Sequence, residues 1–215
     1  MLKGFILLTQ LIILLLFQLI EIKSQNTFVP LKRGAHTATL IDKKLYILGG
    51  YSLSGAEDSV VGQQFFYVDF SESFVTTEVK WVDLTSINLA PPHRRASAVR
   101  GGENDDKLIV FGGEPVTRDL AMVYMFDTVN FSWSTPKLIG SYNPLSKSSL
   151  FPIISNKKMY LFGGFVLQNK NVENNYVDDM VILNTVDFTF TKGSSINAPT
   201  PRGYYGAVLL NQTIL

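Results

Sequence analysis

Apolar and polar positions follow a fixed order that recurs along the chain. Residues 33–41 alternate between apolar and polar side chains, as expected for a strand buried on one face. Asp42-Lys43-Lys44 forms a polar turn, and Leu45–Leu48 is an almost continuous apolar run of strand length. Gly49 and Gly50 end this run, because glycine adopts backbone conformations that side chains forbid. The pattern predicts a half-buried strand, a turn and a buried inner strand.

The apolar run that ends in two glycines occurs three times, which indicates an internal repeat. The three runs are Leu45–Leu48, Leu108–Phe111 and Met159–Phe162, and the glycine pairs that follow them are Gly49 and Gly50, Gly112 and Gly113, and Gly163 and Gly164. The pairs are separated by roughly 50 to 65 residues, and repeats of about this length are typical of solenoids and propellers.

Two further strands are predicted downstream of each glycine pair. The third strands are Phe65–Asp69, Met122–Asp127 and Met180–Asn184, and the fourth strands carry Trp81, Trp133 and Phe190. Four short strands in each unit, separated by glycine and turn residues, describe the blade of a β-propeller. The predicted units span about residues 33–84, 94–136 and 147–191, and a fourth unit starts within 202–215.

The order of residues within a unit resembles the kelch repeat. Arg33 and His36 open the first unit, the glycine pair follows the inner strand, and Trp81 lies in the last strand. In the later units Arg94 and Lys147 are predicted to correspond to Arg33, while Ser97, Leu150 and Tyr205 stand in place of His36, and Phe190 in place of tryptophan. The resemblance covers residues 33–215. It implies an all-β, kelch-type β-propeller of the galactose oxidase-like superfamily, with three full four-stranded blades and the start of a fourth.

The signature residues are assigned to packing rather than to ligand binding. Glycines allow chains to approach closely, and large aromatic side chains fill the wedge between neighbouring blades. These structural residues are Gly49, Gly50, Gly112, Gly113, Gly163, Gly164, Trp81 and Trp133. Catalytic and metal-binding roles are assigned to none of them.

The number of units predicts that this is a fragment of a longer propeller. Closed propellers have about four to eight blades, whereas the chain holds three units and the beginning of another. We expect a complete propeller of about six or seven blades, and the alternative is assembly with a second chain. Residues 26–29 are predicted to be a strand of the final blade.

The N-terminal residues 1–24 have the layout of a secretory signal peptide or signal anchor. Lys3 is followed by a mostly apolar segment, Phe5–Ile20, predicted to be an apolar helix that precedes the propeller. Sixteen residues are short for a membrane span, which needs about 20. The chain has no cysteine, so it forms no disulfide framework. These features predict a protein that is secreted or lies on the extracellular face of a membrane, with membrane contact only through an uncleaved N-terminal segment or a missing C-terminus.

Two asparagines lie in N-x-S/T acceptor sequences for N-glycosylation. Asn130 is predicted in a turn between third and fourth strands, and Asn211 in a turn between first and second strands. Both turns lie on the same face of an up-and-down blade. The opposite face, with the loops that follow the glycine pairs, would remain open to partners.

The sequence contains few residues suited to catalysis or metal binding. With two histidines and no cysteine, it offers a poor metal inventory, and no cofactor is predicted. His36 is predicted to be a structural histidine with satisfied hydrogen bonds and His93 to be solvated. The acidic pairs Asp105-Asp106 and Asp178-Asp179 are assigned to solvated turns, and Arg95 to a surface position. The net charge of +1 gives no electrostatic case for nucleic acid.

Two functional hypotheses follow from the architecture. The first is a non-catalytic interaction module of the secretory pathway that binds a protein or glycan through the loops Tyr51–Gln63, Glu114–Ala121 and Phe165–Asp178. The alternative is a propeller enzyme acting on carbohydrate or another small molecule, with its catalytic residues missing from this fragment. Galactose oxidase-type copper chemistry requires a cysteine cross-linked to a tyrosine, and this chain has no cysteine.

Overall fold

The computed structural model describes residues 28–116, 121–142, 144–166, 176–210 and 213–214. The N-terminal segment 1–24 and Asn211 therefore lie outside the described residues. Within the described residues, the fold is built from antiparallel strands, with one short α-helix, α2 (Asp58–Gln63), and one 3-10 helix, η1 (Thr85–Ile87). The prediction of an all-β fold is confirmed.

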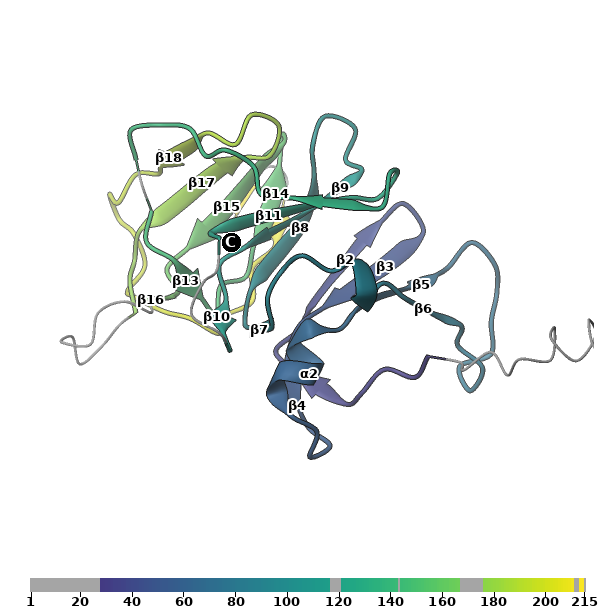
Figure 1. Cartoon of the computed structure of the whole chain (residues 1–215). Helices are drawn as coiled ribbons and strands as arrows, with labels where there is room; N and C mark the ends of the chain where they lie inside the picture. Colours follow the sequence, from purple (N-terminus) through teal and green to yellow (C-terminus); the bar gives the residue numbers. More distant parts are fainter. Residues whose placement is uncertain (1–27, 117–120, 143, 167–175, 211–212, 215) are drawn as a thin grey trace, which may run out of the picture.

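Three four-stranded sheets follow one another along the described chain (Figure 1). The first contains β2 (Thr37–Ile41), β3 (Lys44–Leu48), β5 (Phe65–Asp69) and β6 (Trp81–Asp83). The second contains β8 (Ser97–Gly101), β9 (Lys107–Phe111), β11 (Val123–Asp127) and β12 (Ser132–Ser134). The third contains β14 (Ile153–Ser155), β15 (Lys158–Phe162), β17 (Met180–Asn184) and β18 (Phe190–Lys192). In each sheet the strands pair in chain order, as expected for a propeller blade.

Short strand pairs extend the end of each sheet where the glycine pairs lie (Figure 1). They are β1 (Arg33–Gly34) with β4 (Tyr51–Ser52), β7 (His93–Arg94) with β10 (Glu114–Pro115), and β13 (Lys147–Ser148) with β16 (Phe165–Val166). A further hairpin, β19 (Leu209–Leu210) with β20 (Thr213–Ile214), lies within the predicted fourth unit.

In the part of the chain that the structure describes, two apolar clusters form the core, one between the first and second sheets and one between the second and third. Between the first and second sheets, Phe65 packs edge-to-face against Phe126 with ring centroids 4.8 Å apart. Between the second and third sheets, Phe111 and Phe190 approach in the same manner, at 6.1 Å. The continuous apolar runs predicted as inner strands supply much of this core. In the second sheet, for example, β9 has a neighbouring sheet on each face, so its successive side chains are apolar on both faces.

The glycine pairs join each unit to the next one along the chain. At Gly112 the backbone has a φ of 62°, and an added Cβ would lie 2.1 Å from the carbonyl oxygen of Lys147. The N–H of Gly113 donates to that same carbonyl at 2.9 Å. The equivalent bonds run from Gly50 to His93 and from Gly164 to Arg202. Close backbone approach therefore requires glycine here.

The strand register corrects two predicted correspondences between units. His93, not Arg94, occupies the place of Arg33 and Lys147, because its carbonyl accepts the hydrogen bond from the preceding glycine pair. Likewise Ala96, rather than Ser97, corresponds to His36, since each lies against the second glycine of a pair. The shift arises because the turn between β8 and β9 is longer than that between β2 and β3.

The strand predicted at residues 26–29 is not seen in its described part. Phe28 and Val29 lie outside any strand. The ring of Phe28 instead packs against Phe66 of the first sheet, with centroids 5.2 Å apart. The chain thus enters the fold by covering the face of β5 that points away from the second sheet.

Candidate binding surface

The three predicted binding loops all begin at the end of the sheets that carries the short strand pairs (Figure 1). Each loop opens with one strand of such a pair: β4, β10 or β16. The loop Tyr51–Gln63 is more regular than predicted, because it also contains α2, which lies against β4 and β7. Of Glu114–Ala121, the first three residues and Ala121 are described, and of Phe165–Asp178 the two ends are described.

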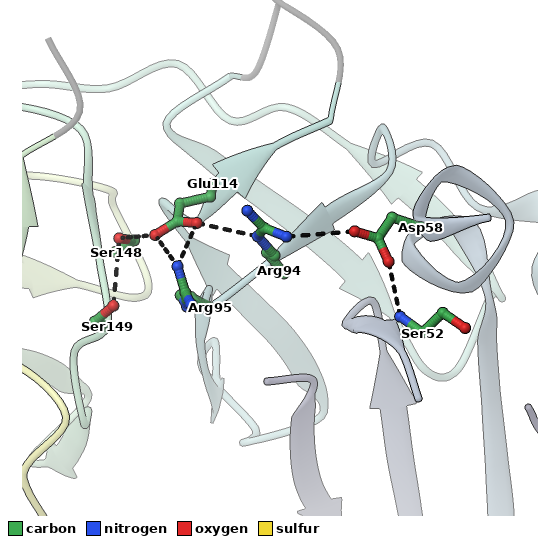
Figure 2. A network of polar contacts seen from close by, with 7 residues as sticks. All are labelled: Ser52, Asp58, Arg94, Arg95, Glu114, Ser148 and Ser149. Carbon is green, nitrogen blue, oxygen red and sulfur yellow. Dashed lines mark hydrogen bonds and ion pairs between the residues drawn. The ribbon is translucent and has the colours of Figure 1, made fainter. Parts of the chain in front are cut away.

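A network of polar side chains connects all three units at this end (Figure 2). Glu114 is its centre: Arg95 Nη1 lies 2.8 and 2.7 Å from the two carboxylate oxygens, and Arg94 Nε donates to Oε2 at 3.1 Å. From the third unit, Ser148 Oγ donates to Glu114 Oε1 at 3.1 Å. Arg94 Nη1 also reaches Asp58 Oδ2 of the first unit at 3.3 Å. The five side chains thus form one continuous network that joins separate units, with Ser148 buried and Arg94 partly exposed.

The ends of this network are fixed by local backbone structure. Asp58 is the first residue of α2, and its Oδ1 accepts the N–H of Ser52 in β4 at 2.9 Å. An acidic side chain at the first turn is favoured by the partial positive charge of the helix N-terminus. At the other end, the hydroxyls of Ser148 and Ser149 lie 3.5 Å apart. Arg94 is therefore held in place by partners on both sides.

The charged side chains of the network stabilise one another in their ionised forms. Burial by itself would raise the pKa of Glu114, but hydrogen bonds from Arg95 and Arg94 outweigh it and hold the pKa below its usual value. The hydrogen bond from Arg95 to Glu114 also raises the pKa of Arg95. With Asp58, the network contains two positive and two negative side chains, so its formal charges balance. Recognition here would depend on hydrogen-bond geometry and shape more than on net charge.

A cavity of about 410 Å³ opens beside the network. It is lined by Arg94, Arg95, Glu114, Pro115, Phe165, Tyr176 and Tyr204. Arg95 stacks over the Tyr204 ring, 5.4 Å from its centroid, and the rings of Phe165 and Tyr176 lie 5.4 Å apart. Arginine and tyrosine are enriched among residues that dominate binding energy in protein interfaces. The cavity therefore combines aromatic contact area with fixed hydrogen-bond donors.

Two of the basic residues that open units form contacts within the fold: Arg33 is half-buried and Lys147 is buried. Arg33 donates to the carbonyls of Gly49 and Val61 at 2.9 and 3.3 Å, and burial lowers its pKa to about 10. Lys147, whose side chain is 1% exposed, forms an ion pair with Asp179, and burial lowers its pKa. Both side chains therefore bond within the fold, and neither is among the residues that line the cavity.

The two histidines have the opposite environments to those predicted. His93 is 2% exposed, with Nδ1 2.7 Å from the Pro91 carbonyl, and its Nε2 has no hydrogen-bond partner among the residues that the structure describes. Burial lowers the pKa of His93. His36, predicted to be a satisfied structural residue, is exposed at the start of β2. The reversal follows from the register, which places His93 at the buried opening position of the second unit.

One of the two acidic pairs is not a solvated turn. Asp179 accepts the Tyr142 hydroxyl at 2.9 Å in addition to its ion pair with Lys147, so it serves a partly buried cluster. Asp105 and Asp106 do lie in the connection between β8 and β9, each paired with a lysine. In the described part of the chain, no group of three or more histidine, cysteine, aspartate or glutamate residues is arranged to hold a metal ion.

Comparison with known proteins identifies the fold. Sheets of four strands in chain order, joined through glycine pairs, define propeller blades. A family model described as the KLHDC2/KLHL20/DRC7 Kelch-repeats domain matches residues 35–215. The chain therefore belongs to the kelch-repeat family, and its three four-stranded sheets are consistent with kelch blades.

Individual relatives are distant. Kelch domain-containing protein 1 of Homo sapiens is 24% identical over 199 residues, which cover 81% of this chain and 45% of that protein. Kelch domain-containing protein 3 of Bos taurus is 25% identical over 190 residues, covering 83% and 46%. Host cell factor of Drosophila melanogaster is 24% identical over 144 residues, covering 64% and 10%. The chain spans about half the length of the two kelch domain-containing proteins and a much smaller part of host cell factor.

Proposed function

We propose that this chain is a non-catalytic protein-binding module of the secretory pathway or cell surface. We propose further that its binding surface is the end of the sheets that carries Glu114 and the cavity beside it. Kelch domains commonly bind proteins, which supports the general assignment. The secretory context rests on the sequence pattern of residues 1–24. Among the described residues, no helix has the length and apolar character needed to cross a membrane.

The observation that carries the proposal is the Glu114 network across three units. Loops on a rigid scaffold are the usual location of binding residues, and here ion pairs hold those residues in fixed positions. Tyr204 remains 63% exposed although Arg95 stacks on it. Because the side chains are already ordered, a ligand loses less free energy in immobilising them. The surface is therefore suited to a protein segment with both polar and aromatic groups.

The proposal is tested by selecting ligands from a displayed library of random peptides on the purified chain. We expect the selected peptides to bind the Tyr204→Ala and Arg95→Ala variants at least about tenfold more weakly than the parent chain, as for interface residues of high energetic weight. Val129→Ala is the matched control, since Val129 is 66% exposed in the turn between β11 and β12 at the opposite end of the sheet. Peptides that bind all three variants equally well, or that lose affinity only for the control, would contradict the proposal.

A further inference from the structure

The turn between β11 and β12 presents an asparagine acceptor sequence in an exposed conformation. Asn130 and Ser132, the first and third residues of the acceptor, are both exposed. The Asn130 Nδ2 donates to Asp127 Oδ2 at 2.9 Å, and its backbone N–H donates to Asp127 Oδ1 at 3.0 Å. Phe131 between them has a φ of 51°, which tightens the turn. The acceptor amide is therefore held at the surface of an ordered turn.

We infer that Asn130 carries an N-linked glycan, an inference that rests on the secretory context proposed above. The donor is an oligosaccharide linked through pyrophosphate to a polyisoprenol lipid. In the transfer, a bond forms between Asn130 Nδ2 and the first sugar carbon while the bond from that carbon to the pyrophosphate oxygen breaks. The lipid pyrophosphate leaves with the electron pair of that bond, and the proton lost from Nδ2 passes to a base of the transferring enzyme. The amide keeps its second hydrogen, so the hydrogen bond to Asp127 can persist in the modified protein.

The position of the turn makes this modification compatible with ligand binding. Val123 at the start of β11 pairs with Phe111, which precedes the glycine pair, whereas Asp127 at its other end pairs with Lys107. Asn130 therefore lies beyond the end of β11 that is remote from Glu114. The four residue-to-residue steps from Val123 to Asp127 separate these ends by about 13 Å. A glycan at Asn130 covers the end of the sheet opposite the cavity and leaves the candidate binding surface open.

The third sheet contains a natural counterpart of this turn that lacks the acceptor. There Asn184 Oδ1 accepts the N–H of Val186 at 2.9 Å, just as Asp127 Oδ1 accepts that of Val129 at 2.9 Å. Phe188 has a φ of 59°, close to that of Phe131. Asp187 stands at the position of Asn130, and Thr189 at that of Ser132. The acid and the amide are exchanged between the two turns, so Asn130→Asp would place a second carboxylate against Asp127. Ser132→Ala is the better way to remove the acceptor, because it leaves the hydrogen bonds between Asn130 and Asp127 in place.

The experiment is synthesis of the full chain in the presence of microsomes, followed by protease protection and peptide N-glycosidase treatment. In chains protected by the membrane, we expect mass spectrometry to find Asn130 converted to aspartate on glycan removal. Ser132→Ala should lack this glycan without a change in thermal unfolding temperature, because Ser132 is exposed. Asp187→Asn should gain one glycan, because it creates the same acceptor in the matching turn.

Two results would overturn the inference, and they bear differently on the proposed function. Protected chains with unmodified Asn130 would overturn the glycan alone and leave the binding surface unaffected. Chains that remain fully protease-sensitive would overturn the glycan together with the secretory context. The peptide-binding measurements described above do not depend on either outcome, so failure of the binding surface is detected separately.

Discussion

Trp133 offers a direct test of how neighbouring sheets stabilise one another. It lies in β12, and its ring centroid is 5.1 Å from that of Phe65 in the first sheet and 5.1 Å from that of Phe126 in its own sheet. The indole therefore contacts aromatic rings of both the first and the second sheet. Trp81 is the matched control: its ring contacts Phe66 of its own sheet at 5.4 Å, on the face away from the second sheet.

The expected magnitude follows from the degree of burial. Replacing a fully buried tryptophan by alanine costs about 3–5 kcal/mol. Trp133 is only partly buried, so we expect the lower limit, a loss of about 3 kcal/mol in the free energy of unfolding. For a chain of this size, that loss corresponds to a decrease in Tm of roughly 6–12 °C. Two aromatic contacts, each worth about 0.5–1.5 kcal/mol beyond area burial, account for part of it.

The assay is chemical or thermal unfolding of the parent chain, Trp133→Ala and Trp81→Ala, monitored by circular dichroism. Trp133→Phe should recover part of the lost stability, because an aromatic ring still contacts both sheets. A loss below about 1 kcal/mol for Trp133→Ala, or a loss equal to that of Trp81→Ala, would refute the argument that the indole couples two sheets.

Two further predictions concern residues at the joints between units. Gly112→Ala should destabilise the protein by about 1–3 kcal/mol more than Gly55→Ala. Both glycines have a positive φ, but of the two only Gly112 has, among the described residues, a backbone carbonyl close to the position of an added Cβ. Equal losses of stability in urea unfolding would exclude this steric explanation. Burial lowers the pKa of His93 in the folded protein, so the unfolded chain takes up a proton first as the pH falls, and stability should decrease below about pH 6.5. His93→Gln should flatten this decrease in unfolding measured between pH 5 and about 7.5, and an unchanged slope would show that His93 is not its source.

The sheets could be predicted because their sequence signals are local. Leu108–Phe111 is apolar and ends at Gly112, and the structure places it in β9, an inner strand. The correspondence between units could not be read from spacing alone. The turn between β8 and β9 is longer than the turn between β2 and β3 in the first sheet. Because of this difference, His93 rather than Arg94 is the residue of the second unit that is equivalent to Arg33. Only the pairing of strands reveals such a shift.

The candidate binding surface was predicted in outline, whereas its central contacts were not. Glu114 lies in a predicted binding loop, but its partner Ser148 belongs to the next unit and comes 34 positions later in the sequence. Arg95 was assigned to the surface as a neighbour of the opening residue, and its pairing with Glu114 depends on how β7 and β10 align. Contacts between units depend on the relative placement of sheets, for which a single sequence has no local signal.

The central claim is that a partner binds at the end of the sheets that carries the short strand pairs. The most direct test is hydrogen–deuterium exchange of the chain with and without a peptide selected as described above. With the peptide bound, we expect slower amide exchange in β4, β10 and β16 than in the free chain, and unchanged exchange in the turn that contains Asn130. Protection confined to that turn, with no effect at β10 around Glu114, would contradict it.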